Sequence, residues 1–294
     1  MDKVNIFDAI EANKRNSLIL ILLMSSLLFF SVAAAGYLFG LNEMGFVFAI
    51  FATVVYVLFA YGAGAQTILS ISGARELDEG EEPFIQNVVE GLAIAAGIPK
   101  PRIWVMEDEG MNAFATGIEP KNSHIVFTRG LLKNMKREEL EGVAAHEISH
   151  IGNYDIRFAT LAVIMVGAIA ILGEFGWRFA GFGGSRSNRK GGSAALLIIA
   201  LAFAILAPIF ATLVKLALSR QREYLADANA AKLTRYPAGL AGALEKISGH
   251  ASVSGATGTT ASLYIADPLK KSMLSGLLAT HPPIEERVKR LRAM

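Results

Sequence analysis

The chain has 294 residues, of which 53% are hydrophobic, and its mean hydropathy of +0.42 is high for a water-soluble protein. Its formal net charge of +2 is too small to favour nucleic acid as a partner. Because it has no cysteine, it forms no disulfide and offers no thiolate to a metal ion.

Four stretches contain no Asp, Glu, Lys or Arg: residues 16–42, 44–74, 158–173 and 191–214. A bilayer core about 30 Å thick takes roughly 20 helical residues, so the first, second and fourth stretches are each long enough to span it. The third stretch is shorter. It is either a span that continues past Glu174 or a re-entrant segment.

The first apolar stretch also has to be compared with a signal peptide, because "VAAAG" at 32–36 has the small residues of a cleavage site. The apolar run is longer than a usual signal core, and acidic residues lie among the basic ones before it. These features favour an anchor that is not cleaved.

The basic residues near the spans predict the orientation. Three precede the first span, namely Lys3, Lys14 and Arg15, whereas the connection between the first two spans has none. This pattern places the N-terminus and residues 75–157 in the cytosol. If the third and fourth segments both cross, the basic loop at 178–190 lies outside the cytosol, which is contrary to the same charge pattern. Because the first spans usually set the orientation, a crossing hairpin is expected, and a re-entrant hairpin is the alternative.

These features predict four regions, which are an anchor with two spans (1–74), a cytosolic catalytic region (75–157), an apolar hairpin (158–218) and a second cytosolic catalytic region (219–294). In the first cytosolic region, periodicity and turn residues predict two helices, at 83–96 and 137–151, and a small antiparallel sheet from strands at 102–106, 112–118 and 124–128. Helices are also expected at 215–233 and near the end of the chain.

The predicted helix at 137–151 carries "HEISH" at 146–150. His146 and His150 are four positions apart, so their imidazoles can point at one metal ion. Glu147 projects beside that point, where a carboxylate can take a proton from water. H-E-x-x-H on a helix is typical of catalytic zinc sites, and the alternative is three ordinary residues on a helix surface.

A catalytic zinc ion needs a third protein ligand. The metzincin pattern requires a glycine at position 153 and a histidine at position 156, but the chain has Asn153 and Ile156. A glutamate from another helix is the remaining common choice. Glu223 in "REYLAD" can ligate zinc while Asp227, four positions later, orients a ligating histidine. The alternative is that Glu223 pairs with a neighbouring arginine on a solvated helix.

The motifs "HEISH" at 146–150, "EYLAD" at 223–227, "NAFATG" at 112–117 and "THPP" near the end resemble those of the HtpX family of membrane zinc metalloproteases, which is related to the CAAX prenyl endopeptidases. The resemblance covers nearly the whole chain. It implies a mainly α membrane protein, with a gluzincin-like zincin core, a small antiparallel sheet and about four transmembrane helices.

The resemblance also implies a role for each matching residue. One zinc ion per chain is expected, with His146, His150 and Glu223 as its ligands, Glu147 as general base and Asp227 as support for a ligand. The implied activity is hydrolysis of membrane or misfolded proteins at the cytosolic face of a bacterial or archaeal plasma membrane. Protein quality control and the stress response are the implied processes, and the lipid bilayer is the expected surrounding.

Two further features are candidates for substrate handling. Asn112, Ala113, Phe114 and Ala115 belong to a strand whose edge can pair with an extended substrate, and the alternative is a plain strand with Phe114 in the core. His281 in "THPP" can stabilise the oxyanion, and the alternative is a residue that merely precedes a helix.

Other functions are alternatives to the general protease. A prenyl-protein endopeptidase would use the same ligand set. A scaffold with a structural metal is disfavoured, because structural zinc sites commonly include cysteines. A transporter is disfavoured too, because ionisable residues are expected inside its membrane segments.

Overall fold

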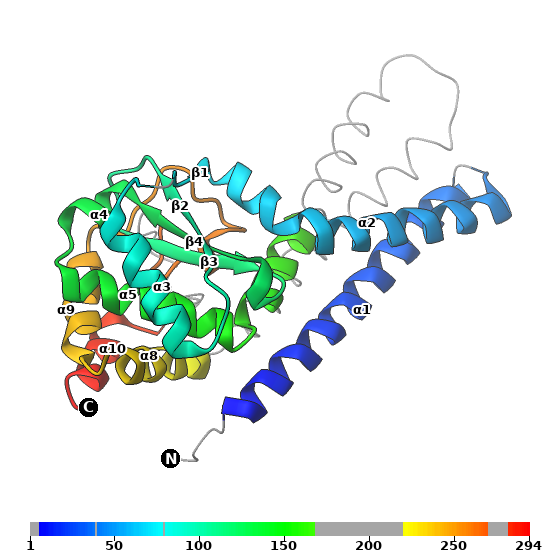
Figure 1. The fold of residues 1–294 in the computed structure, drawn as a ribbon. Coiled ribbons are helices and arrows are strands. Elements are labelled where there is room, and N and C mark those ends of the chain that lie inside the picture. Colours follow the sequence, from blue (N-terminus) through cyan, green and yellow to red (C-terminus); the bar gives the residue numbers. More distant parts are fainter. Residues whose placement is uncertain (1–5, 39, 79, 168–219, 270–281) are drawn as a thin grey trace. The chain divides into compact units, whose positions relative to one another are not determined.

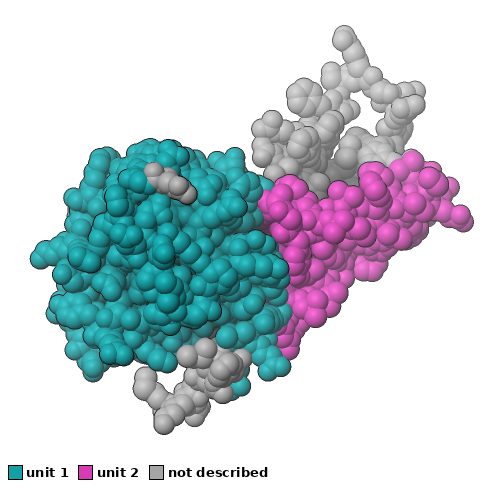
Figure 2. All heavy atoms as spheres, viewed as in Figure 1, with its two compact units in different colours: residues 1–14, 65–160, 215–294 teal, residues 15–64, 161–214 magenta. Residues whose placement is uncertain are grey.

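The computed structural model describes residues 6–38, 40–78, 80–167, 220–269 and 282–294 (Figure 1). The chain divides into two compact units (Figure 2). Unit 1 comprises residues 1–14, 65–160 and 215–294, and unit 2 comprises residues 15–64 and 161–214. The H-E-x-x-H motif therefore belongs to unit 1, and most of the long apolar helices belong to unit 2.

Two long helices, α1 (Ile6–Leu38) and α2 (Asn42–Ile71), supply most of the described part of unit 2. Their segments Ile10–Ala34 and Asn42–Ile71 are long and apolar enough to cross a bilayer. Only 28% and 17% of their most apolar windows are buried, and Phe51 and Leu58 are 63% and 66% exposed. Core helices of a water-soluble protein would be covered, so these helices have the surface expected of membrane spans.

The third apolar segment is helical from residue 155 to residue 167, where its described part ends. Within unit 2, the Tyr56 hydroxyl of α2 donates a hydrogen bond of 2.8 Å to the carbonyl of Ile164 in this segment. The loop at 178–190 and the fourth apolar segment at 191–214 lie outside the described residues. The crossing hairpin and the re-entrant hairpin both stay predictions.

Unit 1 contains a four-stranded sheet in the order β1-β2-β4-β3, formed by β1 (Ala74–Glu76), β2 (Arg102–Met106), β3 (Ala113–Gly117) and β4 (Ser123–Thr128). The prediction of an antiparallel sheet is wrong in one respect, because β2 and β4 run parallel while the two outer pairs are antiparallel. Nearly every residue of β4 is buried, which suits a central strand. The chain therefore passes from β2 to the edge strand β3 before it returns in β4.

Several helices of unit 1 pack against the sheet and against each other. The described part of unit 1 contains α3 (Pro83–Ala96), α4 (Arg129–Asn134), α5 (Arg137–Gly152), α8 (Arg220–Thr234), α9 (Pro237–Ile247), α10 (Ile284–Leu291) and the short 3-10 turns η1 (Pro120–Asn122) and η2 (Ala261–Leu263). Helix α5 packs against α3, α8, α9 and β3 (Figure 1). Most of its residues between Leu140 and Ile151 are buried. It is the core helix of the unit, so each polar side chain that it buries needs a partner.

Close packing between α5 and α9 depends on Gly142. A Cβ atom at this position would lie 2.6 Å from the backbone nitrogen of Leu240 in α9 and 2.8 Å from its Cα. A side chain at position 142 would therefore force the two helices apart.

Candidate metal centre

The H-E-x-x-H motif lies on the buried middle of α5. His146 and Glu147 are 0% and 1% exposed, and His150 is partly buried. This burial excludes the alternative of three ordinary surface residues. Burying polar side chains costs free energy unless they are hydrogen-bonded, paired or bound to an ion, so their placement indicates a binding role.

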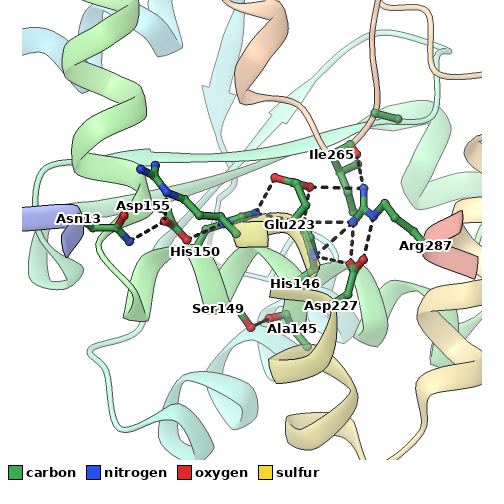
Figure 3. A network of polar contacts seen from close by, with 12 residues as sticks. Asn13, Ala145, His146, Ser149, His150, Asp155, Glu223, Asp227, Ile265 and Arg287 are labelled. Atoms are coloured by element: carbon green, nitrogen blue, oxygen red, sulfur yellow. Dashed lines mark hydrogen bonds and ion pairs between the residues drawn. The ribbon is translucent and has the colours of Figure 1, made fainter. Parts of the chain in front are cut away.

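Glu223 of α8 meets the two histidines at one point (Figure 3). The Nε2 atoms of His146 and His150 lie 3.1 Å apart, and carboxylate oxygens of Glu223 lie 3.8 Å and 3.6 Å from them. Two nitrogens bound to a tetrahedral zinc ion are separated by about 3.3 Å, because each Zn–N bond is about 2.0–2.1 Å long. Two imidazoles and a carboxylate are also a donor set of catalytic zinc, so the residues present fit the ion.

A carboxylate holds the Nδ1 atom of each histidine. Asp227 Oδ1 lies 3.1 Å from His146 Nδ1, and Asp155 Oδ2 lies 2.9 Å from His150 Nδ1. A carboxylate partner keeps the proton on Nδ1, so the lone pair of Nε2 is directed at the shared point. The sequence predicted this role for Asp227. It missed Asp155, which comes just after α5 ends.

Arg287 is a second residue that sequence reasoning missed. It is fully buried, and its Nε and Nη2 atoms donate to the two oxygens of Asp227 at 2.9 Å and 2.7 Å. Its Nη1 atom donates to the carbonyl of Ile265 and lies 3.5 Å from Glu223 Oε2 (Figure 3). Burial alone would raise the pKa of Asp227, but the charge of Arg287 outweighs it and holds that pKa below its usual value. Arg287 thus keeps Asp227 ionised beside His146.

Glu147 lies beside the histidines and Glu223 and is 1% exposed. Its Oε1 atom is buried and has no hydrogen-bond partner within the described residues, while the backbone of Ala115 hydrogen-bonds to its carboxyl group. Burial raises the pKa of Glu147 to about 7. A buried carboxyl oxygen with no protein partner is ready to bond to a water or a substrate at the centre.

The two histidines have pKa values shifted in opposite directions. Burial lowers the pKa of His146 to about 4. Burial also works against protonation of His150, but the hydrogen bond with Asp155 and the charge of Glu223 outweigh it and raise that pKa to about 9. The carboxylates of Asp155 and Glu223 therefore favour a positive charge at His150.

The histidines, Glu147 and Glu223 line a cavity of about 40 Å³. Residues 262–265 form part of its wall, as does Ala115 of β3. A cavity needs about 10–15 Å³ of such space to hold one water, so the space between the described residues suits an ion with a few waters and is too small for a peptide.

The four strand residues that the sequence predicts to bind substrate have different surroundings in the structure. The Asn112 side chain is buried and donates to the carbonyls of Ala251 and Ala266, so it holds two loops together. Phe114 is fully buried against Tyr264, as in the alternative interpretation of a core residue. Of the four predicted residues, Ala115 lines the cavity.

The edge of β3 already has a neighbour. Tyr264 forms an isolated antiparallel bridge with Phe114, and the backbone nitrogen of Ile265 donates to the carbonyl of Ala113 at 2.9 Å. This chain segment lies at the edge of β3 with which the sequence predicts that an extended substrate pairs. His281 lies outside the described residues, so its predicted role stays a prediction.

Comparison with known proteins agrees with this geometry. A model of Peptidase family M48 matches residues 79–294. A protein named Protease HtpX homolog from Dictyoglomus thermophilum is 52% identical over 100% of this chain and 96% of its own length. A protein of the same name from Streptococcus gordonii is 43% identical over 98% of this chain and 100% of its own.

A solved structure shares the fold. The crystal structure of S. mikatae Ste24p superimposes with a TM-score of 0.52 at 20% identity, and covers 97% of this chain and 67% of that one. The family model and the relatives confirm the resemblance to HtpX proteases and the expected enzyme class, a metalloendopeptidase. Since the family model matches most of the chain and the relatives match nearly all of it, the chain belongs to Peptidase family M48.

Proposed function

We propose that this chain is an integral-membrane zinc endopeptidase that hydrolyses membrane or misfolded proteins at the cytosolic face of a bacterial or archaeal plasma membrane, in quality control or the stress response. The observation that carries the proposal is the meeting of His146, His150 and Glu223 at one point beside the buried carboxyl group of Glu147. Membership of a peptidase family supports the reaction, and two apolar helices support the membrane.

The residues have separate parts in the reaction. His146, His150 and Glu223 would hold one zinc ion per chain, and a bound zinc ion supplies a Lewis acid for the scissile carbonyl and makes a water more acidic. Glu147 takes the proton from the attacking water and gives it to the leaving amine. Asp227 holds the ring of His146 in the orientation that ligation needs.

An extended substrate is proposed to pair with the edge of β3 next to Ala115. Residues 262–265 occupy part of that edge, so they have to move before a peptide backbone can bind there. The contribution of Asn112, Ala113 and Phe114 is to fix the strand, because their contacts are with neighbouring chain segments. His281 is proposed to stabilise the oxyanion.

The test is purification in detergent with a chelator, followed by measurement of self-cleavage and casein cleavage with and without added zinc. Glu147→Gln is expected to bind zinc as the unchanged chain does and to lose nearly all cleavage, because the base is absent. Glu223→Ala is expected to lose zinc as well as cleavage.

Two results would contradict the proposal. Cleavage by Glu147→Gln at the rate of the unchanged chain would reject the base, and an unchanged zinc stoichiometry in Glu223→Ala would reject the third ligand. A non-catalytic scaffold predicts bound zinc with no cleavage in any variant. A prenyl-protein endopeptidase predicts cleavage of prenylated peptides with no cleavage of casein.

A further inference from the structure

An amide side chain near the start of α1 is buried, although it lies in the first turns of a long apolar segment. Asn13 is 3% exposed and belongs to unit 1. Its Nδ2 atom donates one hydrogen bond of 2.9 Å to the carbonyl of Asn153 and another of 2.7 Å to Asp155 Oδ1. Both protons of one amide group are therefore used on the turn that follows α5.

Asp155 connects this amide to the metal centre. One of its oxygens accepts from Asn13 and the other lies 2.9 Å from His150 Nδ1 (Figure 3). The guanidinium of Arg222 lies farther away, with Nε at 3.8 Å from Asp155 Oδ1. The Asn13 amide is thus the close hydrogen-bond donor to the oxygen that does not face the histidine, and it fixes how the carboxylate is rotated.

The turn held by Asn13 is strained. Tyr154 has a φ of 60°, in the left-handed region that costs a residue with a side chain free energy. The Lys14 ammonium lies 4.3 Å from the centre of the Tyr154 ring, and the Arg157 guanidinium lies 5.0 Å from it. The adjacent residues Asn13 and Lys14 therefore both contact this turn, Asn13 by hydrogen bonds and Lys14 by a cation–π contact.

We propose that Asn13 is a positioning residue of the zinc centre, which acts through Asp155 on the orientation and basicity of His150. The proposal rests on the proposed function only in taking zinc as the metal. Hydrogen-bond partners of ligating histidines tune metal affinity, and here the partner is itself held by a residue at the start of the first candidate membrane span. The N-terminal segment would then be part of the metal centre as well as an anchor.

The experiment measures zinc affinity, so it does not depend on turnover. The full chain carrying Glu147→Gln, which prevents self-cleavage, is purified in detergent and titrated with zinc against a competing chelator. Asp155→Ala is expected to weaken zinc binding by about 10- to 100-fold. Asn13→Ala is expected to weaken it by about 2- to 10-fold, which corresponds to the net value of one hydrogen bond.

A double variant separates positioning from a general structural role. If Asn13 acts through Asp155, Asn13→Ala causes no further loss of zinc affinity in a chain that already carries Asp155→Ala. Cobalt(II) in place of zinc gives a second readout, because its visible absorption reports ligand geometry. Asn13→Ala is expected to shift that absorption.

Asn16→Ala is the matched control. It removes the same amide group about one turn farther along α1, and that amide has no side-chain hydrogen bond within the described residues. Zinc affinity and cobalt absorption are expected to stay unchanged. The thermal stability of each metal-free variant shows whether it is folded.

The outcomes are distinct. Unchanged zinc affinity in Asn13→Ala overturns the inference, even if that variant unfolds at a lower temperature. An equal loss with and without Asp155→Ala also overturns it, because Asn13 would then act by another route. If the unchanged chain fails to bind zinc, the proposed function fails first, and that result appears without any change at position 13.

Discussion

The two histidines of the H-E-x-x-H motif each lie against a carboxylate that has a partner of its own. Asp227 is paired with Arg287, and Asp155 accepts from Asn13. The sequence could supply the proposed ligands and Asp227, because helical spacing relates His146 to His150 and Glu223 to Asp227, and the residue types of catalytic zinc sites relate the two pairs. It could not supply the two partners, because they lie 60 and 142 positions from the carboxylates they bind, and such distances leave no periodic pattern.

The buried pair of Arg287 and Asp227 leads to a prediction of stability. Arg287→Met leaves the carboxylate of Asp227 in the core without its cation, so the free energy of unfolding is expected to fall by about 3–5 kcal/mol. Thermal and chemical unfolding of the Glu147→Gln chain in detergent, with and without Arg287→Met, measures this loss.

Lys289→Met provides the control for Arg287→Met. It removes a positive charge from the same helix at an exposed position, and the expected change is within about 0.5 kcal/mol. Equal effects of the two substitutions would show that Arg287 does not stabilise a buried charge.

At the scale of elements, local patterns predicted the bounds well and the sheet order poorly. Helix α3 has the predicted ends, and β2 matches its predicted strand. Alternation and helical periodicity are properties of neighbouring residues, so a single sequence contains them. The parallel pairing of β2 with β4 depends on which strand enters the middle of the sheet, and packing between distant segments decides that.

The approach of α5 to α9 gives a prediction in which packing opposes helix propensity. Alanine is favoured over glycine in a helix by about 1 kcal/mol, but a Cβ at position 142 would overlap the backbone of Leu240. Gly142→Ala is therefore expected to destabilise unit 1 by about 1–3 kcal/mol. Unfolding in detergent measures the change.

Gly91→Ala, in α3, is the matched control. It adds the same methyl group to a helix at an exposed glycine with no atom within 4 Å of the new Cβ, so it is expected to stabilise by about 0.4–1 kcal/mol. Stabilisation by both substitutions would mean that α5 and α9 are not in tight contact.

At the scale of the whole molecule, unit 1 is assembled from three separate stretches of chain. The helices that carry the proposed ligands, α5 and α8, both belong to it, although about 70 residues that include two apolar segments separate them in the sequence. Hydropathy found the candidate spans because length and composition suffice for that. It could not decide how the third and fourth apolar segments lie, because the basic loop between them contradicts the charge pattern of the first two.

A topology reporter decides between the two hairpins. A fusion after Ser187 is expected to report from outside the cytosol, because the first spans set the orientation and both later segments then cross. Fusions after Glu43 and after Met294 serve as controls and are expected to report from outside and from the cytosol. A cytosolic signal at Ser187 would reject the crossing hairpin in favour of the re-entrant one.

The narrow cavity beside Glu147 bears on how unwanted proteolysis of neighbouring proteins would be avoided. A protease embedded among other membrane proteins is surrounded by peptide bonds at high local concentration, and the described residues leave a space of only about 40 Å³ beside Glu147. Tyr264 and Ile265 bond to the edge of β3 at which a substrate is proposed to align, so an incoming chain would have to displace this segment first. Under the proposed function, selectivity would begin with the ability of a substrate to displace that segment, and unfolded segments that pair well as β-strands would enter first.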